Sequence, residues 1–432
     1  MINRSVDRYP INPVELTQAL IRIPSEGRTP KDPALHTPER PLVEYMKEWV
    51  TVRASNGFKA QEIATADSER PSLLVSNSDL PRLIVVSHID TVPRWEVGSK
   101  EGQGQYDPFG ATIVDGMVYG RGAGDAKSAV AAMLVAAALS ENAIPTALAL
   151  TSDEETRFGG IDAMGAHFGK LMAANPGYEP VFVFSTNGNG EEISYGCRGL
   201  WEIDTVVRGK TGHAAIRKPG VPAPINAFDA TIDAYVGLRQ FYAGQEPTFL
   251  GNVTINPGGG RYGLRVNNEI VTRYNSVADT SEIALEGRPN GGFHNGTALD
   301  ASHAEGLIRR FVEASGATIE SSKIVAERPA WRSNRTEGLW LEDIIKRTTG
   351  VSEVPEWVYG EHGYDEVAIL IGELSKKRQG SIAGGLWGIG ISTKFHAVDE
   401  GVYVDKIGQL ESVVRQAMTS PDLRSRTYSL PS

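Results

Sequence analysis

Apolar stretches and helix-forming stretches alternate along the first half of the chain. The apolar, β-branched segment "RLIVVSHI" (82–89) predicts a strand that is buried on both faces of a parallel sheet. The next segments, "DAKSAVAAMLVAAALSEN", "TALALTSDEE", "GGIDAMGAHFGKLM" and "PVFVFSTNG", predict a helix, a strand, a helix and a strand. Such a series is typical of a parallel sheet with helices on both faces.

The pattern changes after Gly199. "LWEIDTVVRGK" alternates like a half-exposed antiparallel strand, and further strands and two helices are predicted as far as "TIESSKIVAE". The C-terminal part again mixes helices with an apolar strand, "GLWGIGIS", before a closing helix. We therefore predict an α/β catalytic domain from residues 1–199 and 330–432, interrupted by a smaller α+β domain at 200–329.

Composition and charge narrow the function classes. Apolar residues make up 41% and charged residues 22% of the 432-residue chain, as in ordinary globular proteins. The formal net charge of -10 excludes a general nucleic-acid or anionic-membrane binder, because either would need a basic face. Cys197 is the only cysteine, so no internal disulfide forms. The N-terminal "MINRSVDRYP" has no apolar core of signal-peptide length, and the longest apolar run, "SAVAAMLVAAALS", is too short to span a bilayer, so we expect a cytoplasmic protein.

The first predicted strand ends in side chains that bind metals or protons. His88 and Asp90 lie two positions apart, so on a strand both would point to the same face. Asp90 could then accept a hydrogen bond from the ring nitrogen of His88 that does not bind a metal. Taken alone, such a pair more often marks a histidine that is simply satisfied by a neighbouring carboxylate.

Further charged side chains lie next to predicted strands and helices, where they could join His88 and Asp90. Asp125 follows three glycines in "YGRGAGDAKSA", but the spacing does not fit a dinucleotide-binding loop. Glu154 and Glu155 follow a predicted buried strand, where one could bind a metal while the other takes a proton from water. A solvated acidic loop is the alternative for these two residues. His396 follows the last predicted strand and could complete a metal site.

Five stretches resemble a known family in their order and content. "SHIDTVP", "GRGAGDAK", "SDEETRFGG", "YGCRGLWEIDTVVRGKTGHAA" and "FHAVDEGV" are similar to motifs of the aminoacylase, carboxypeptidase G and succinyl-diaminopimelate desuccinylase family of co-catalytic metallohydrolases. The resemblance implies a mainly parallel-sheet, zinc-hydrolase-like α/β domain with an inserted α+β lid or dimerisation domain. It also implies a homodimer or a higher homo-oligomer.

The resemblance also assigns roles to individual residues. It makes four residues metal ligands, with Asp125 bridging two metals: His88, Asp125, Glu155 and His396. Asp90 would orient His88, and Glu154 would be the general base and acid. His213, in the inserted domain, would reach the active site of a neighbouring subunit and polarise the scissile group.

Two departures from the family pattern affect the metals and the substrate. The family places an acidic ligand after the third strand, where this chain has the neutral "STNG" with Asn187. We therefore expect one firmly bound divalent metal (zinc, manganese or cobalt) and a weakened second site. The residues that bind a substrate carboxylate are also less clear in this chain. The candidates are Arg261, Arg265 and Arg273, together with Asn187 and with His362 in "GEHGYDEVAIL".

The predicted function is hydrolysis of a carbon–nitrogen bond, an amide by default, in a small carboxylate-bearing molecule through metal-activated water. One alternative is an aminohydrolase that releases ammonia from an activated aromatic amine such as 5-nitroanthranilate, with a single labile metal. A second alternative is a relative that binds a ligand without catalysis. Retention of Glu154 favours the enzymes over the binding protein.

Overall fold

The computed structural model describes most of the chain. The described residues are 8–27, 37–54, 56–98, 100, 102–178, 180–187, 192–215, 219–220, 222–248, 250–267, 269–273, 275–356, 365–375, 382–388 and 396–425. The chain divides into two compact units. The first comprises Met1–Tyr195, Ser333–Trp357 and Asp365–Ser432, and the second is built on Gly196–Arg332.

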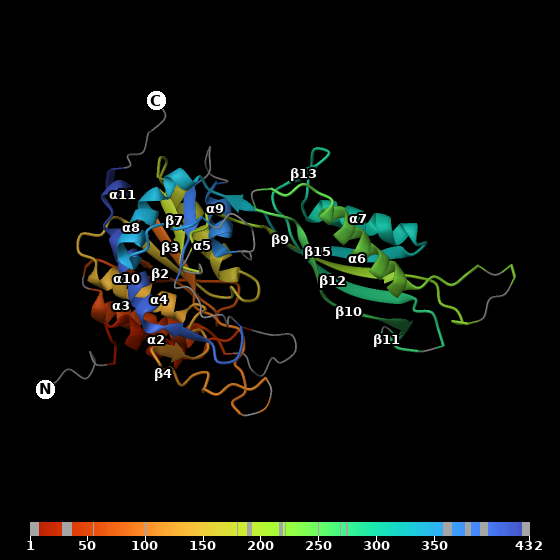
Figure 1. Cartoon of the computed structure of the whole chain (residues 1–432), viewed down its shortest axis with the longest axis horizontal. Coiled ribbons are helices and arrows are strands. Elements are labelled where there is room, and N and C mark those ends of the chain that lie inside the picture. The colour runs from red at the N-terminus through yellow and green to blue at the C-terminus, as the bar shows by residue number, and fades with distance from the viewer. Residues whose placement is uncertain are drawn as a thin grey trace. The chain divides into compact units, whose positions relative to one another are not determined.

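The core of the first unit is a six-stranded sheet in the order β1-β2-β6-β3-β7-β17. Figure 1 labels β2, β3 and β7 of this sheet. Its strands are β1 (Lys59–Ile63), β2 (Ser72–Ser76), β6 (Thr146–Thr151), β3 (Leu83–His88), β7 (Phe182–Ser185) and β17 (Ala383–Leu386). The four strands from β6 to β17 run parallel, and β1 and β2 add an antiparallel edge. Every residue of β3, β6 and β7 is buried, because helices cover both faces of the sheet.

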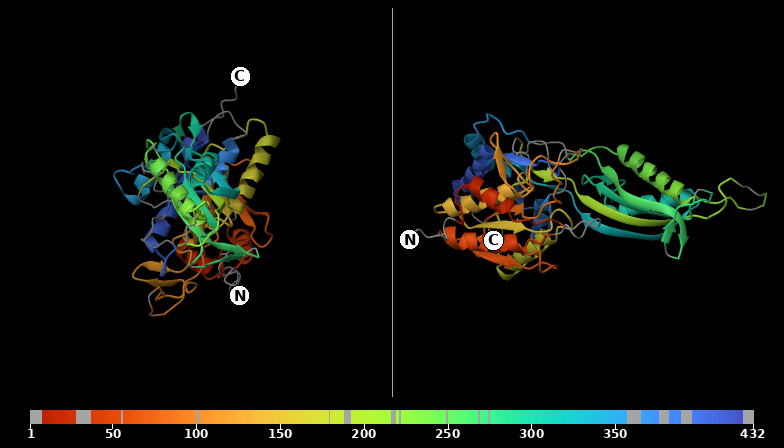
Figure 2. Two further views of the ribbon diagram at one scale, coloured as in Figure 1. Left: turned by 90° about the vertical axis from the view of Figure 1, so that its right-hand side faces the viewer. Right: turned by 90° about the horizontal axis from the view of Figure 1, so that it is seen from below.

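Helices flank this sheet on two sides (Figures 1 and 2). They are α2 (Pro13–Ile21), α3 (Arg40–Arg53), α4 (Lys127–Leu139), α5 (Gly159–Ala174), α8 (Leu339–Thr349), α9 (Glu366–Ser375), α10 (Val404–Met418) and α11 (Pro421–Ser425). The alanine-rich α4 is the central helix of one side and packs against α2, α10 and β3. On the other side α5 packs against α9, and α9 also contacts β3 and β7. The start of α9 therefore lies close to the ends of these strands.

A small antiparallel sheet links two loops of the first unit. It pairs β4 (Thr112–Val114) with β5 (Met117–Tyr119), and β5 with β18 (Gly401–Tyr403). The segment that follows β5 leads to α4, and β18 follows directly on the loop that begins at His396. The pairing of β5 with β18 therefore brings together two predicted site loops that are far apart in sequence.

The second unit is an antiparallel sheet in the order β11-β10-β12-β9-β15. Its strands are β9 (Leu200–Arg208), β10 (Thr254–Val266), β11 (Glu269–Val271), β12 (Thr280–Arg288) and β15 (Thr318–Arg328). The helices α6 (Ala227–Ala243) and α7 (Ala301–Ala314) pack on each other and on one face of this sheet (Figure 1). Alternating apolar residues of β9 meet these helices in the core, which explains the period-two pattern of "LWEIDTVVRGK".

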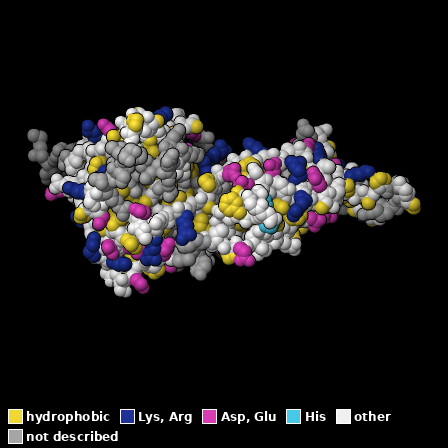
Figure 3. All heavy atoms as spheres, turned by 90° about the horizontal axis from the view of Figure 1, so that it is seen from above, with side chains coloured by type: hydrophobic (Ala, Val, Ile, Leu, Met, Phe, Trp, Pro, Cys, Tyr) yellow, Lys and Arg dark blue, Asp and Glu magenta, His cyan; other side chains and the backbone are white. Residues whose placement is uncertain are grey.

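Short elements complete both units. In the second unit β8 (Gly196–Cys197) pairs with β16 (Trp331–Arg332), and β13 (Phe293–His294) pairs with β14 (Thr297–Ala298). In the first unit the 3-10 turn η2 (Arg335–Glu337) precedes α8. On the face drawn in Figure 3, basic and acidic side chains are interspersed over the described surface.

The predicted fold class is confirmed: an α/β unit with a mainly parallel sheet is interrupted by a smaller α+β unit. The sequence patterns did not predict β1 and β2, which lie at the antiparallel edge and have short apolar runs. Among the described helices, none combines the length and apolar character that crossing a membrane requires.

Candidate metal centre

Three predicted ligands lie together at the carboxyl ends of the parallel strands. His88 is the last residue of β3 and lies opposite Thr151, the last residue of β6. Because parallel strands end at one edge of the sheet, the loop after β6 brings Glu155 towards His88. One ligand atom from each of His88, Asp125 and Glu155 lies within 4.8 Å of the other two.

Individual distances place Asp125 between the two histidines. Its Oδ1 lies 2.7 Å from Nε2 of His88, and its Oδ2 lies 3.3 Å from Nε2 of His396. The same His396 nitrogen lies 3.1 Å from Oε1 of Glu155. The structure thus brings all four predicted ligands together, with the side chain of His396 at the exposed rim of the group (52% exposed) and that of His88 in the interior (2%).

The pKa shifts of the two histidines and of Asp125 indicate that this cluster attracts positive charge. Burial lowers the pKa of His88, but the nearby Asp125 and Glu154 outweigh burial and raise that pKa well above its usual value. Hydrogen bonds to Asp125 and Glu155 raise the pKa of His396 to about 10. Burial acts to raise the pKa of Asp125, yet the two histidines hold it below its usual range.

The residues present fit a divalent transition metal. Two imidazole nitrogens and two carboxylates form a mixed nitrogen and oxygen donor set, which suits zinc, manganese or cobalt. In the metal-free cluster the histidines hold protons against the carboxylates, and a bound cation would take the place of those protons. The metal identity does not follow from the geometry.

Asp90 connects the histidine to the acidic loop. Nδ1 of His88 lies 3.0 Å from the main-chain oxygen of Asp90 and 3.7 Å from its carboxylate. That carboxylate instead accepts hydrogen bonds from the main-chain N–H groups of Glu154 and Glu155, each at 3.0 Å. The strand ends at His88, so the period-two argument does not extend to Asp90, and the main-chain oxygen is the nearer partner of the ring.

The loop that presents Glu154 turns sharply after β6. Asp153 has a left-handed backbone (φ 61°), and its carboxylate accepts a hydrogen bond from Arg70 at 3.0 Å. This turn sends Glu154 and Glu155 back over the strand end. Burial raises the pKa of Glu154 well above its usual value, and the neighbouring Glu155 raises it further, while His88 opposes both.

Sequence reasoning missed two residues that hold the Asp125 loop in place. Oε1 of Glu400 accepts hydrogen bonds from the main-chain N–H groups of Gly124 (2.9 Å) and Asp125 (3.0 Å). Oε2 of Glu400 lies 2.7 Å from Arg121, and both side chains are almost fully buried. Glu400 follows His396 within "FHAVDEGV", and Arg121 lies within "GRGAGDAK", so both stood inside recognised motifs without an assigned role.

Two further acids were missed on α9. Asp365 precedes the helix and Glu366 opens it, and both are buried beside the strand ends. The sequence signal was an acid pair inside an otherwise apolar stretch, "YDEVAILIG", which overlaps the segment "GEHGYDEVAIL" already considered for substrate binding. Acidic side chains usually lie at the surface, where solvent or a basic partner satisfies them. The burial of Asp365 and Glu366 could therefore not be inferred from the sequence.

The three arginines predicted to bind the substrate carboxylate differ in whether they already form ion pairs. Arg261 lies 2.6 Å from Glu282, and Arg265 lies 3.2 Å from Glu320, so both guanidinium groups are already paired. Arg273 is exposed and forms no ion pair within the described part of the chain.

The remaining predicted residues have different surroundings. Asn187 follows β7, and its Oδ1 lies 3.5 Å from the Ser87 hydroxyl. His213 is exposed in the second unit, where it pairs with Ser276 in an isolated bridge and its Nδ1 accepts a hydrogen bond from Ala215. His362 lies outside the described residues.

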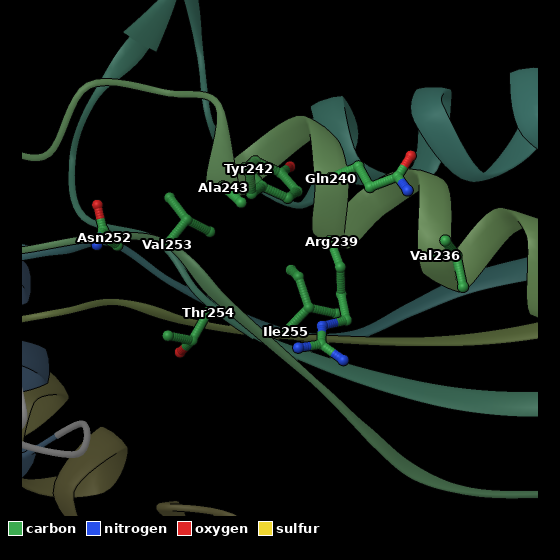
Figure 4. A pocket seen from close by; sticks show the side chains of 9 residues that line it. All are labelled: Val236, Arg239, Gln240, Tyr242, Ala243, Asn252, Val253, Thr254 and Ile255. Atoms are coloured by element: carbon green, nitrogen blue, oxygen red, sulfur yellow. The ribbon is translucent and has the colours of Figure 1, made fainter.

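A recess of about 570 Å³ lies in the second unit between α6 and β10 (Figure 4). Arg239 and Tyr242 of α6 face Val253 and Ile255 across it. None of the predicted site residues lines this recess. The predicted chemistry therefore belongs to the strand ends of the first unit and not to this hollow.

A family model for "Peptidase family M20/M25/M40" matches residues 84–420. The chain belongs to this peptidase family. The matched range includes every predicted metal ligand and the whole of Gly196–Arg332 in the second unit, and the family predicted from the five motifs is confirmed.

Individual relatives agree with this assignment. Over 208 residues the chain is 32% identical to the succinyl-diaminopimelate desuccinylase of Wolinella succinogenes, covering 47% of this chain and 50% of that enzyme. The chain thus spans about half the length of the curated relatives it matches. For the desuccinylase of Wolbachia pipientis, the match covers 49% of the length of that enzyme. A tripeptidase of Staphylococcus aureus has the same fold, with a TM-score of 0.65, 18% identity and coverage of 94% of this chain and 97% of that one.

Proposed function

We propose that this chain is a metal-dependent hydrolase that cleaves a carbon–nitrogen bond, an amide by default, in a small carboxylate-bearing substrate. The main support is the gathering of His88, Asp125 and Glu155 at the strand ends, directly beside the half-buried Glu154. Membership of a peptidase family supports amide hydrolysis. The similarity to desuccinylases supports the bond type and a carboxylate on the substrate.

The residues that would hold the first metal are Asp125, Glu155 and His396, with His88 on the other side of Asp125. A bound divalent ion would lower the pKa of water and polarise the scissile carbonyl. We expect zinc, manganese or cobalt, because the donor set is shared among these ions.

Glu154 would move the proton during the reaction. Its main-chain N–H is fixed by Asp90, so the side chain projects from a held position beside the ligands. Burial and Glu155 raise the pKa of Glu154, which favours uptake of a proton from the attacking water. The same carboxyl group would then deliver this proton to the departing nitrogen.

The second unit would contribute to substrate binding within a cytoplasmic homo-oligomer. His213 is exposed, as a residue donated to another subunit must be. Ser276 links His213 to the neighbourhood of Arg273, because the Ser276 main-chain N–H donates to the Arg273 carbonyl (3.4 Å). Of the three candidate arginines, we therefore favour Arg273 as the group that binds the substrate carboxylate, since Arg261 and Arg265 already have acidic partners.

A substrate panel tests the proposed function. Protein reconstituted with zinc, manganese or cobalt is assayed with N-acyl amino acids, dipeptides and aminobenzoates, and the release of amine, carboxylate and ammonia is recorded. We expect metal-dependent cleavage of at least one amide. Ammonia release from an aminobenzoate without amide cleavage would favour the aminohydrolase alternative, and metal binding without turnover on any class would contradict the proposal.

A further inference from the structure

A buried arginine lies beside the loop that presents Glu154 and Glu155. We call residues 152–157, which follow β6, the acid loop. Arg70 precedes β2, and β2 pairs antiparallel with β6, so the chain around Arg70 lies next to the end of β6 where the acid loop begins. Arg70 is 3% exposed. A charged group at this depth requires acceptors and a counter-charge, so the partners of Arg70 indicate what it holds in place.

The guanidinium of Arg70 joins three parts of the first unit. Its Nη1 donates a hydrogen bond to Oδ1 of Asp153 in the acid loop at 3.0 Å. The same nitrogen lies 3.2 Å from Oε1 of Glu39, directly before α3, and Nη2 donates to the main-chain oxygen of Glu26 at 3.4 Å. The Arg70 and Glu39 side chains are 4% and 0% exposed, so water hardly competes for these contacts. Arg70 therefore holds Asp153 against two segments that are distant from it in sequence.

The main chain next to Arg70 holds the acid loop as well. The carbonyl oxygen of Arg70 accepts a hydrogen bond from the Ser152 hydroxyl at 2.7 Å, and Oγ of Ser72 accepts one from the Ser152 main-chain N–H at 3.1 Å. Ser72 and Ser152 are completely buried. The stretch 70–72 thus extends the contact between β2 and β6 past the end of the strand pairing, and it holds two consecutive residues of the acid loop, Ser152 and Asp153.

Asp153 has a backbone conformation that requires such support. Its φ of 61° lies in the left-handed region, which aspartate adopts more readily than most residues but still at a cost in free energy. The turn that begins at Asp153 is closed by hydrogen bonds from the main-chain N–H groups of Arg157 (3.1 Å) and Phe158 (2.7 Å) to the Asp153 carbonyl. Because Arg70 binds the carboxylate of the same residue, it fixes the turn at its first residue.

The orientation of this turn decides where the two glutamates point. Glu154 and Glu155 directly follow Asp153, and Asp90 accepts hydrogen bonds from their main-chain N–H groups, each at 3.0 Å. These bonds fix the main chain on one side, and the rotation of the turn about them is set at Asp153. Glu155 supplies a ligand atom of the metal cluster, so a rotation of the turn would displace a ligand.

We propose that Arg70 is a positioning residue of the metal centre, which sets the direction of Glu154 and Glu155 by fixing Asp153. The alternative is that Arg70 only balances the buried charges around it. Lysine distinguishes the two roles, because it keeps the positive charge but lacks the planar fork that contacts Asp153 and the Glu26 carbonyl together. The proposal rests on the proposed function only in making Glu155 a metal ligand and Glu154 the proton-transfer group.

Metal binding tests the positioning role without an activity assay. Metal-free protein is titrated with Mn²⁺, with free Mn²⁺ measured by electron paramagnetic resonance, and the visible absorption of Co²⁺-loaded protein reports the ligand geometry. Arg70→Lys and Asp153→Asn should each weaken Mn²⁺ binding about 10–100-fold and alter the Co²⁺ spectrum, as expected when a group that supports a metal ligand is lost. The double variant should bind about as weakly as the weaker single variant, because both changes break the same contact.

Glu39→Gln is the matched control. It alters the surroundings of the same guanidinium from the side of α3 and leaves the acid loop in place, so the Mn²⁺ affinity should equal that of the wild type. Burial raises the pKa of Glu39 to about 8, so glutamine resembles the protonated side chain at neutral pH.

Urea unfolding shows whether each variant is folded. Should Arg70→Lys fail to fold, Asp153→Asn carries the test, because asparagine also adopts the left-handed conformation. The proposal is overturned if the folded Arg70 and Asp153 variants bind Mn²⁺ as tightly as the wild type with an unchanged Co²⁺ spectrum. It is also overturned if Glu39→Gln weakens binding equally, or if the wild type has no specific Mn²⁺ site.

The metal readout separates this proposal from the proposed function. A protein that binds Mn²⁺ with the expected dependence on Arg70 but cleaves no amide would contradict the hydrolase function and support the positioning role. A protein whose amide cleavage and Mn²⁺ binding are both unaffected by Arg70→Lys and Asp153→Asn would contradict the positioning role alone.

Discussion

Replacing Glu400 with glutamine should both destabilise the first unit and weaken metal binding, although Glu400 is not a predicted ligand. The wild-type carboxylate joins the buried Arg121 guanidinium to the main-chain N–H groups of Gly124 and Asp125. Glutamine has nearly the same shape, and its oxygen can still accept the two main-chain hydrogen bonds. What it removes is the negative charge, which leaves Arg121 buried without a counter-charge.

The geometry sets the expected magnitude. The Arg121 and Glu400 side chains are 4% and 1% exposed, so solvent hardly screens the pair. Breaking a buried ion pair by removing one partner typically costs about 3–5 kcal/mol in the free energy of unfolding. Altering a group that supports a metal ligand typically lowers metal affinity about 10–100-fold, which we expect here because Glu400 fixes the backbone of Asp125.

Urea unfolding of the metal-free protein measures the stability, and Mn²⁺ titration measures the affinity. Because the chain has two compact units, the transition of the first unit is identified as the one that bound metal shifts to higher urea. Arg415→Gln is the control in the same unit. It breaks an i,i+4 pair with Glu411 whose arginine is 43% exposed, and should change stability by no more than about 0.5 kcal/mol.

A Glu400→Gln protein with wild-type stability and wild-type Mn²⁺ affinity would refute this reasoning. It would mean that the ion pair with Arg121 is not formed in the metal-free protein, or that the Asp125 loop is held by other contacts. Loss of stability with unchanged affinity would reject only the positioning role of Glu400.

Three further predictions concern Glu154 as the proton-transfer group, the buried carboxyl of Glu366, and His213 in the second unit. Glu154→Gln should keep the fold and bound metal and lose about 10²–10⁴-fold in kcat, because an amide cannot transfer the proton; a near-normal rate would exclude Glu154 as the base. Metal-free protein should lose stability as the pH rises from about 4.5 to about 8, because Glu366 binds its proton more tightly in the folded state, and Glu366→Gln should flatten this profile in urea unfolding. His213→Ala and Glu154→Gln proteins should each be nearly inactive alone, and subunit exchange should restore roughly a quarter of wild-type activity if a dimer donates His213 between subunits. No recovery after demonstrated exchange would remove His213 from the neighbouring site.

Much of the candidate site could be predicted from local patterns. His88, Glu154 and Glu155 each follow an apolar run that forms a fully buried strand, and the end of such a strand is marked in the sequence itself. The role of Asp90 in orienting His88 stays a prediction, and the carboxylate of Asp90 lies 3.7 Å from Nδ1 of His88. The side chain of Asp90 binds the loop after β6, and its main-chain oxygen lies nearest to the His88 ring.

The sequence by itself determined the family, the buried strands β3, β6 and β7 and the residues at their ends, because apolar runs and short motifs are local properties of the chain. Only the tertiary structure decided which distant groups support those residues. Glu400 meets Gly124 across 276 positions, and Glu366 meets Thr151 across 215. No local pattern specifies such contacts, since they depend on the order of strands in the sheet and on which helix packs over each strand end. For the same reason, the sequence predicted a weakened second metal site at the neutral end of β7, and only the packing of α9 places the buried carboxylate of Asp365 against that strand end.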